Sequence, residues 1–319
     1  MNKNYGMLSR VADSLFWLNR YMERADGMLR LASTHYILSL DKDASRSITW
    51  RPVIEIFTDA EPDRVRAMEH DTEETLRQLL LETSNPNSLK AIIGRARENA
   101  RGAQDHITKE VWEEINQFYH HVNQPGLLLK INSFHGLDVM RPLIRHTVQY
   151  TGVADITMPR GTGWWFMNLG KYMERCLQTI AFMEKHLEIM PVQDTPSNDL
   201  LQWRQLLLSL SGYELHLKTY QTADHDENVV HQVLANENFT RSVIYSMQRI
   251  DLNLKKITQH DNSREGLALL SSFGRLFSKV RFTETDRLKP AALPGLFEEI
   301  RMALLEFNQQ IAEHFFSYS

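Results

Sequence analysis

The sequence predicts an all-α protein, an internally duplicated helical bundle of about a dozen helices. Good helix formers dominate the chain, and its 319 residues include only 14 Gly and 10 Pro. Apolar side chains recur at spacings of three and four residues, as on one face of a helix. In addition, the motif Tyr-Met-Glu-Arg occurs twice, at residues 21–24 and 172–175. A repeat this long indicates two domain-sized halves rather than a solenoid of short units.

The first half is expected to contain five main helices, at about residues 9–40, 72–81, 89–102, 108–121 and 136–150. Side chains that favour helix starts precede three of them, namely Asp71, Ser88 (or Asn87) and Thr108. Pro142 predicts either a helix that begins near it or a kink. Few runs alternate as a β-strand would, and the clearest is the short run 53–57.

The stretch 151–163 contains three Gly and one Pro without periodicity, and it is expected to connect the halves. The predicted division is therefore 1–155 and 156–319, with the two halves packed as one unit. In the second half, Ser197 or Asn198 is expected to start the second helix. The helices expected there are 164–190, 200–220, 227–234, 240–257, 264–280 and 293–316.

A second alignment supports the duplication. Ser88-Leu89 followed by Arg95 matches Ser242-Val243 followed by Arg249. These positions lie 154 residues apart, against 151 for the Glu-Arg motif. Two independent alignments at nearly equal spacing favour a true repeat over chance.

Composition excludes several classes of partner. The formal net charge is −4 and the pI is about 6.4, which gives no general attraction to nucleic acid or anionic membrane. No apolar run reaches the roughly 18 to 20 residues that span a bilayer, and residues 1–6 lack the apolar core of a signal peptide. Cys176 is the only cysteine, so no intrachain disulfide can form, and a core position in a cytoplasmic protein is expected.

The Glu-Arg motif allows two interpretations. Arg20 precedes Glu23 by three residues, and Lys171 likewise precedes Glu174, so these residues could form pairs on a solvated helix surface. Alternatively, the two long helices pack across a pseudo-two-fold axis and form reciprocal pairs. Those pairs would be Glu23 with Arg175 and Arg24 with Glu174. Phe16 and Gly27 lie on the same face as the charges, which favours a face that is covered.

A second charged group lies within one predicted helix, at Arg95, Arg97, Glu98, Asn99 and Arg101. Arg97 and Arg101 are one turn apart and share a face. Clustered arginines could bind Glu23 or Glu174 internally, or they could bind a phosphate or carboxylate ligand.

These features resemble the alpha-E family of all-helical bacterial proteins, which are named for their Glu-Arg motif. The resemblance covers nearly the whole chain and rests on residues 8–18, 21–24, 85–88, 95–101, 112–113 and 170–175. The second half has Asn236-Glu237-Asn238-Phe239 where a turn like that at Asn85 is expected. The resemblance implies association with circularly permuted ATP-grasp proteins, and also with transglutaminase-like proteins and a proteasome-like peptidase. ATP-grasp enzymes join carboxylates to amines through an acyl phosphate.

The main functional hypothesis is a noncatalytic partner or scaffold of an ATP-grasp-type ligase, without cofactor or metal. No Walker loop, dinucleotide fingerprint, nucleophile elbow or His-Glu-x-x-His motif occurs. One alternative is a catalytic subunit, with Glu23 and Glu174 as acid/base groups and Arg24 and Arg175 as carboxylate ligands. Another is a metal carrier, for which the candidate ligands are His120, His121, His225, Asp226, Glu227 and His231.

Overall fold

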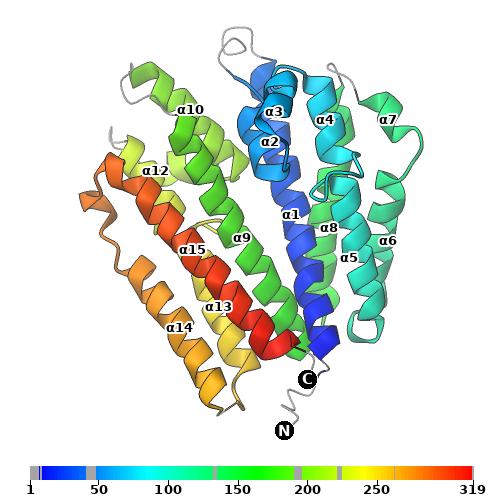
Figure 1. Cartoon of the computed structure of the whole chain (residues 1–319), viewed down its shortest axis with the longest axis vertical. Helices are drawn as coiled ribbons and strands as arrows, with labels where there is room; N and C mark the ends of the chain where they lie inside the picture. Colours follow the sequence, from blue (N-terminus) through cyan, green and yellow to red (C-terminus); the bar gives the residue numbers. More distant parts are fainter. Residues whose placement is uncertain are drawn as a thin grey trace. The chain divides into compact units, whose positions relative to one another are not determined.

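The structure, a computed structural model, describes residues 7, 9–40, 48–131, 135–189, 196–220, 225–261 and 263–317. These residues form helices and turns without any strand (Figure 1), which confirms the all-α prediction. The first half contains α1 (Ser9–Ser39), α2 (Arg51–Phe57), α3 (Pro62–Met68), α4 (Thr72–Leu80), α5 (Leu89–Gly102), α6 (Lys109–Val122), α7 (Leu127–Lys130) and α8 (Gly136–Thr157). The second half contains α9 (Thr162–Ile189), α10 (Pro196–Ser209), α11 (Tyr213–Thr219), α12 (His225–Leu234), α13 (Val243–Ile257), α14 (Arg264–Arg281) and α15 (Leu293–Ile311). None of the helices in the described ranges is long and apolar enough to cross a membrane.

The chain divides into two compact units. Residues 21–158 form one, called here the N-half unit. Residues 1–20 and 159–319 form the other, called the C-half unit. Helix α1 therefore contributes its first turns to the C-half unit and the rest of its length to the N-half unit.

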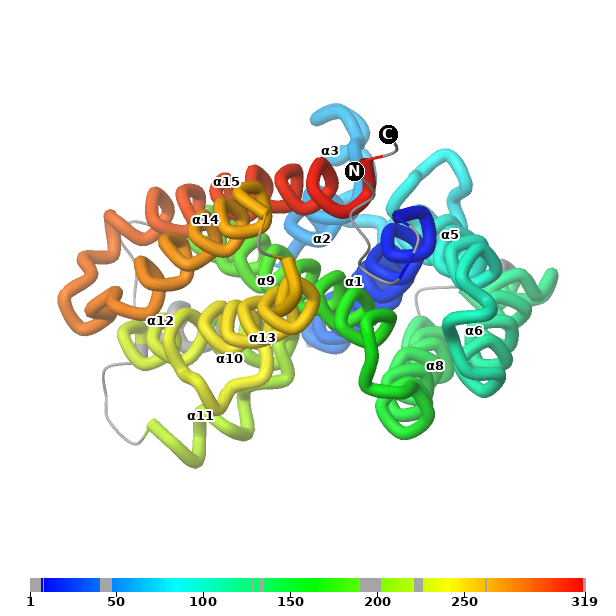
Figure 2. The backbone as a smooth tube through the Cα atoms, turned by 90° about the horizontal axis from the view of Figure 1, so that it is seen from below, coloured from blue at the N-terminus to red at the C-terminus, as the bar shows by residue number. Residues whose placement is uncertain are grey.

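In the N-half unit, α5 packs against α6 and α6 packs against α8, and the three helices lie side by side (Figure 2). The side chains between them recur every three or four residues, as the sequence pattern predicts. Those with almost no exposed surface include Ile92, Ala96, Val111, Ile115, Phe118 and Leu143.

In the C-half unit, α9 packs against both α13 and α15, and α14 packs against the same two helices. The four helices thus enclose one apolar core, lined by Met173, Ile180, Met247, Phe273, Phe297 and Leu304. A turn of π-helix, Ala312–Phe316, continues α15.

The duplication extends to the core positions of both halves. Helices α1, α5, α6 and α8 correspond to α9, α13, α14 and α15, with intervals of 151, 154, 155 and 161 residues. The interval grows along the chain in part because α13 and α14, with 15 and 18 residues, are longer than α5 and α6, with 14 each. Buried residues that match at these intervals are Leu18 and Leu169, Met22 and Met173, Ile93 and Met247, Phe118 and Phe273, and Leu143 and Leu304.

The run 53–57, the clearest strand-like pattern in the sequence, is helical and forms most of α2. Pro52 lies in the first turn of this helix, where its missing N–H costs nothing. Val53, Ile54 and Phe57 are buried together, which is the spacing of one helix face rather than of a strand.

Two predicted boundaries were wrong. The stretch 151–163 is mostly helical, since α8 continues through Pro142 to Thr157 and only four residues separate it from α9. The single helix predicted at 200–220 is two helices, α10 and α11. Ser211 adopts a left-handed φ of 57° between them, and the Gly212 N–H donates to the Leu207 carbonyl at 2.7 Å. This is a helix-terminating motif that usually contains Gly in place of Ser211, so its sequence signal is weak.

Candidate functional site

The second Glu-Arg motif places Glu174 in a buried ion pair with Arg20. Arg20 Nε and a terminal guanidinium nitrogen approach Glu174 Oε2 at 2.9 and 2.8 Å. The other terminal nitrogen donates to Asn308 Oδ1 at 2.8 Å. The two charged side chains are 6% and 4% exposed. The pair therefore joins α1, α9 and α15 within the C-half unit.

The guanidinium of Arg20 also has aromatic neighbours. Its central carbon lies 4.6 Å from the centre of the Trp17 ring and 5.6 Å from that of Phe16. Phe16 in turn contacts Phe316 of the π-helical turn, with ring centres 5.3 Å apart. Aromatic faces attract a cation, and here they also shield the ion pair from water.

The solvated-surface interpretation of the motif is wrong for both glutamates. Glu23 is 5% exposed and Glu174 is 3% exposed, and Phe16 and Gly27 on the same face are also buried. The covered-face interpretation is confirmed to that extent. The reciprocal pairs of Glu23 with Arg175 and of Arg24 with Glu174 stay a prediction. Lys171, which corresponds to Arg20 in the repeat, is half-buried with its ammonium 5.7 Å from the Tyr172 ring.

The two arginines of the motif make equivalent contacts in the two halves. Arg24 donates to Asn87 Oδ1 at 3.1 Å, within the N-half unit. Arg175 donates to the Thr240 carbonyl at 3.3 Å, within the C-half unit. In each half, the arginine thus binds the loop that leads into the next core helix, α5 or α13. We call these two contacts the arginine clamps.

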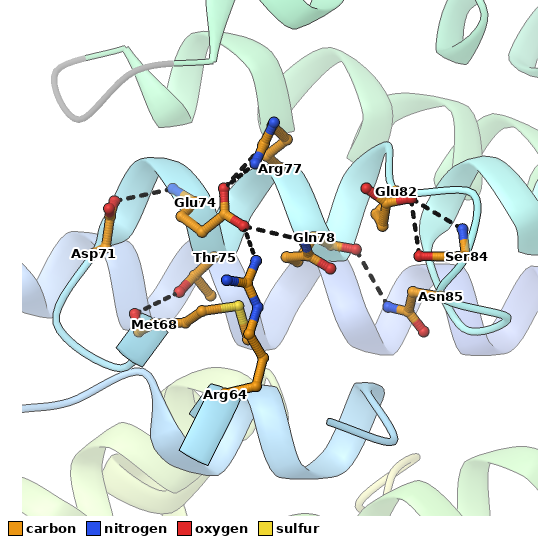
Figure 3. Close-up of polar contacts among 10 residues, drawn as sticks. All are labelled: Arg64, Met68, Asp71, Glu74, Thr75, Arg77, Gln78, Glu82, Ser84 and Asn85. Carbon is orange, nitrogen blue, oxygen red and sulfur yellow. Dashed lines mark hydrogen bonds and ion pairs between the residues drawn. The ribbon is translucent and has the colours of Figure 1, made fainter. Parts of the chain in front are cut away.

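The clamped loop of the N-half unit is held by local hydrogen bonds. The Asn85 amide donates to the carbonyls of Phe57 and Gln78 at 3.2 Å each, and its oxygen accepts from the Asn87 N–H at 2.9 Å. Figure 3 shows the bond to Gln78 at the end of α4, together with Glu74, which accepts hydrogen bonds from Arg64 and Arg77. Asn87 therefore comes into reach of Arg24 on a rigid turn.

The corresponding loop of the C-half unit has the same design with three more residues. Asn236 Oδ1 accepts from the Asn238 N–H at 2.9 Å, as Asn85 does from Asn87. Each loop ends in a serine, Ser88 or Ser242, that caps the following helix. The extra residues explain why the repeat interval increases from 151 to 154 at this point. The Asn236 turn is thus the counterpart of the Asn85 turn.

The arginine group on α5 serves its own helix and α6. Arg97 Nε donates to Asn116 Oδ1 at 2.7 Å, and its guanidinium lies 4.7 Å from the Tyr119 ring. Arg101 pairs with Glu98 at 2.5 Å, and Asn99 donates to the Arg95 carbonyl. Arg97 is thus bound by α6, and a link from this group to Glu23 or Glu174 stays a prediction. Arg95, Glu98 and Arg101 are exposed, and an anion site there stays a prediction.

Both halves contain a buried pair of aromatic rings that the sequence motifs did not predict. His35 packs on Trp50 and His186 on Trp203 with tilted rings, each with ring centres 4.6 Å apart, and we call these the His-Trp pairs. Burial lowers the pKa of each imidazole to about 4. The tryptophan N–H groups donate to Thr72 and Asp226, which lie in the first turns of α4 and α12. A signal was available, because the two histidines lie 151 residues apart, the interval of the Glu-Arg motif.

Several of the candidate metal ligands are hydrogen-bonded to other side chains. His231 accepts or donates a hydrogen bond with the Tyr220 hydroxyl at 2.7 Å, and His121 is bonded to His146. Asp226 is bound by Trp203, and the side chain of His225 lies outside the described residues. Among the described side chains, no three His, Cys, Asp or Glu residues are grouped as metal ligands. Cys176 is buried, and burial raises the pKa of its thiol well above the usual range.

Comparison with known proteins agrees with this architecture. A family named Alpha-E, described as a predicted alpha-helical domain with a conserved ER motif, matches residues 7–316. Uncharacterized proteins of Mycobacterium bovis and Mycobacterium tuberculosis are 21% identical over 322 residues, covering 95% of this chain. The chain spans only 36% of the length of these relatives. No solved structure matches.

Proposed function

We propose that this chain, which belongs to the Alpha-E family, is a noncatalytic partner of an ATP-grasp-type enzyme that forms peptide or amide bonds. In this proposal the helical bundle binds and positions the ligase, and the ligase carries out the chemistry. The proposal places the chain in the cytoplasm, where the ligase has ATP. A transglutaminase-like protein is a second possible partner in the same system.

The observation that carries the proposal is the buried ion pair of Arg20 and Glu174. A general acid or base must come within about 2.6 to 3.2 Å of the proton that it moves. Glu174 is 4% exposed and is already bonded to a guanidinium, so a substrate has no approach to it. Arg175 binds the Thr240 carbonyl, and Arg24 binds Asn87. Three of the four motif residues proposed for a catalytic site, Glu174, Arg24 and Arg175, thus make contacts within the bundle.

The length of the relatives also favours a partner. The region similar to this chain is about a third of each mycobacterial protein. In those proteins, the region similar to this chain is therefore joined to a large additional part of the chain. A domain that is fused to others in some proteins commonly associates with separate partners elsewhere.

The exposed arginines of α5 are the surface that we assign to the partner. Arg95 and Arg101 lie on the outside of the N-half unit, and neither contributes to the buried core. Interfaces are enriched in arginine, which can bind carboxylates through two hydrogen bonds at once.

The proposal is tested with the tagged full chain, recovered from its host and analysed by mass spectrometry. Recovery of an ATP-grasp protein is expected, and ATP turnover of that purified protein should rise when the chain is added. R95A/R101A should weaken binding about tenfold or more, with an unchanged melting temperature. Lys255 corresponds to Arg101 in the repeat and is exposed, so K255A is the matched control and should bind normally. Turnover by the chain alone, abolished by an equally stable Glu23→Gln variant, would instead establish the catalytic alternative.

A further inference from the structure

Three titratable side chains form a continuous hydrogen-bonded chain between α6 and α8 of the N-half unit. His146 Nδ1 lies 2.8 Å from Glu114 Oε1, and His146 Nε2 lies 3.0 Å from His121 Nδ1. Glu114 is buried and the His146 side chain is 15% exposed. The Phe118 ring stacks on His146 with ring centres 4.9 Å apart. We call these three residues the Glu-His-His chain.

The chemistry of the donors and acceptors fixes how many protons this arrangement can hold. A carboxylate only accepts, so His146 Nδ1 carries a proton and donates it to Glu114. When both rings are neutral, His146 Nε2 accepts a hydrogen bond from His121 Nδ1. One added proton is tolerated, because a single N–H still lies between the two facing nitrogens.

A second added proton is not tolerated. Both facing nitrogens would then carry N–H groups 3.0 Å apart, and neither could accept. Two imidazolium rings would also repel each other, and one carboxylate cannot neutralise both. The hydrogen bond that joins α6 to α8 through the two rings would therefore be lost.

The C-half unit provides an internal control for this joint. At the repeat intervals of 155 and 161 residues, Glu114 corresponds to Leu269, His121 to Leu276 and His146 to Phe307. Phe307 packs on Phe273, with ring centres 4.8 Å apart, as His146 does on Phe118. At these three positions, the same pair of helices thus closes with apolar side chains. The Glu-His-His chain is not required to make the fold.

We propose that the Glu-His-His chain is an acid-sensitive joint, which holds α6 to α8 near neutral pH and releases them when both imidazoles become protonated. The charged groups that face His121 are His146 on α8 and Lys130 on α7, and Glu114 acts through His146. Release would make α6 more mobile. It would also weaken the contacts through which α6 holds Arg97 of α5.

The direction of the pH effect follows from His121. Burial, followed by the charges of His146 and Lys130, lowers the pKa of His121 below its usual 6.5. The open form therefore binds this proton more readily than the closed form does. The closed joint keeps its full stability above about pH 6.5 and loses it as the pH falls through the lowered pKa, by at most about tenfold per pH unit for one proton.

The test is amide hydrogen exchange of the full chain at about pH 7.5 and about pH 5.5, corrected for intrinsic exchange rates. Protection of α6 and α8 should fall severalfold at the lower pH, while that of α14 and α15 stays constant. H121Q keeps a side-chain donor for His146 but does not titrate, so its α6 and α8 should stay protected at both pH values.

A second variant carries the residues of the C-half unit, E114L/H121L/H146F, and should behave as H121Q does. An equal loss of protection in H121Q and in the natural protein would overturn the proposal. So would an equal loss in α14 and α15. Nitrogen NMR of the imidazoles gives an independent readout, since His146 must carry its proton on Nδ1 at neutral pH. A proton on Nε2 alone would also overturn the proposal.

Discussion

The N-half and C-half units share their helix order and core positions but differ in the polar groups between the helices. The joint of α6 and α8 contains the Glu-His-His chain, where α14 and α15 have Leu269 and Phe307. The reverse occurs at the end of α15, where His314 binds Asp261 at 3.0 Å beside a cavity of about 420 Å³. Its counterpart in the N-half unit is Val153.

This comparison separates what the fold needs from what each half has added. Three features occur in both halves and belong to the shared framework. They are the arginine clamps, the serine caps and the His-Trp pairs. The Glu-His-His chain and the Asp261–His314 pair occur once each. Polar groups of this kind are where we look for regulation or binding.

The largest effect is expected from Glu174→Ala. The change leaves the Arg20 guanidinium buried without its carboxylate, and such a loss typically costs about 3 to 5 kcal/mol. Chemical denaturation of the full chain measures it. The double variant R20M/E174L should recover most of the lost stability, because well-packed apolar side chains can replace a buried pair. Equal losses in the single and double variants would mean that the ion pair is not the origin of the effect.

The next largest effect is the loss of stability at acid pH that the two buried His-Trp pairs cause. Burial lowers the pKa of His35 and His186 to about 4, whereas each has a pKa of 6.5 when unfolded. Each His-Trp pair therefore makes its full contribution to the free energy of unfolding above pH 6.5. That contribution falls as the pH drops toward 4, by roughly 3 kcal/mol per histidine.

Unfolding free energies of H35F, H186F and the double variant, measured from about pH 7 to about pH 4, check this prediction. Each single variant should remove a similar share of the acid sensitivity if the halves are equivalent here. If one variant removes a clearly larger part of the acid sensitivity than the other, the two halves are not equivalent at this position.

The smallest effect concerns Gly170, which corresponds to Asn19 in the repeat. A Cβ atom at Gly170 would lie 2.1 Å from the Phe16 carbonyl oxygen, so backbone would have to move. Gly170→Ala should therefore destabilise the protein by about 1 to 3 kcal/mol. Gly274→Ala on α14 is the control, since nothing lies within 4 Å of its added atom. The control should raise stability by about 0.5 to 1 kcal/mol, as Ala usually does over Gly in a helix. A gain of stability for Gly170→Ala equal to that of the control would contradict the packing argument.

Much of the fold could be predicted because it depends on short-range signals. The caps Asp71, Ser88 and Thr108 accept the hydrogen bonds predicted for them. The errors arose where a local signal was weak or misleading. Ser211 ends α10 without the usual Gly, and α8 continues into the Gly-containing stretch 151–163 that was expected to connect the halves.

The candidate site was predictable only in part. The repeat identified Glu23, Arg24, Glu174 and Arg175, and the apolar residues around them indicated a covered face. The sequence could not identify Arg20 as the partner of Glu174, because their contact depends on how α1 crosses α9 in the C-half unit. His35 and His186 are separated by the repeat interval of 151 residues, so the repeat could have identified them. Their contacts with tryptophan were not predictable, because the chain must fold back over each long helix to form them.

The sequence by itself determined the helical class, the duplication and most helix starts, since these follow from periodicity and from bonds between near neighbours. Only the tertiary structure decided which charges meet, which histidines are buried and which joints are polar. Those choices depend on packing between helices that are distant in the chain. A difference of one turn or a few degrees between two helices changes which side chains come within hydrogen-bonding distance.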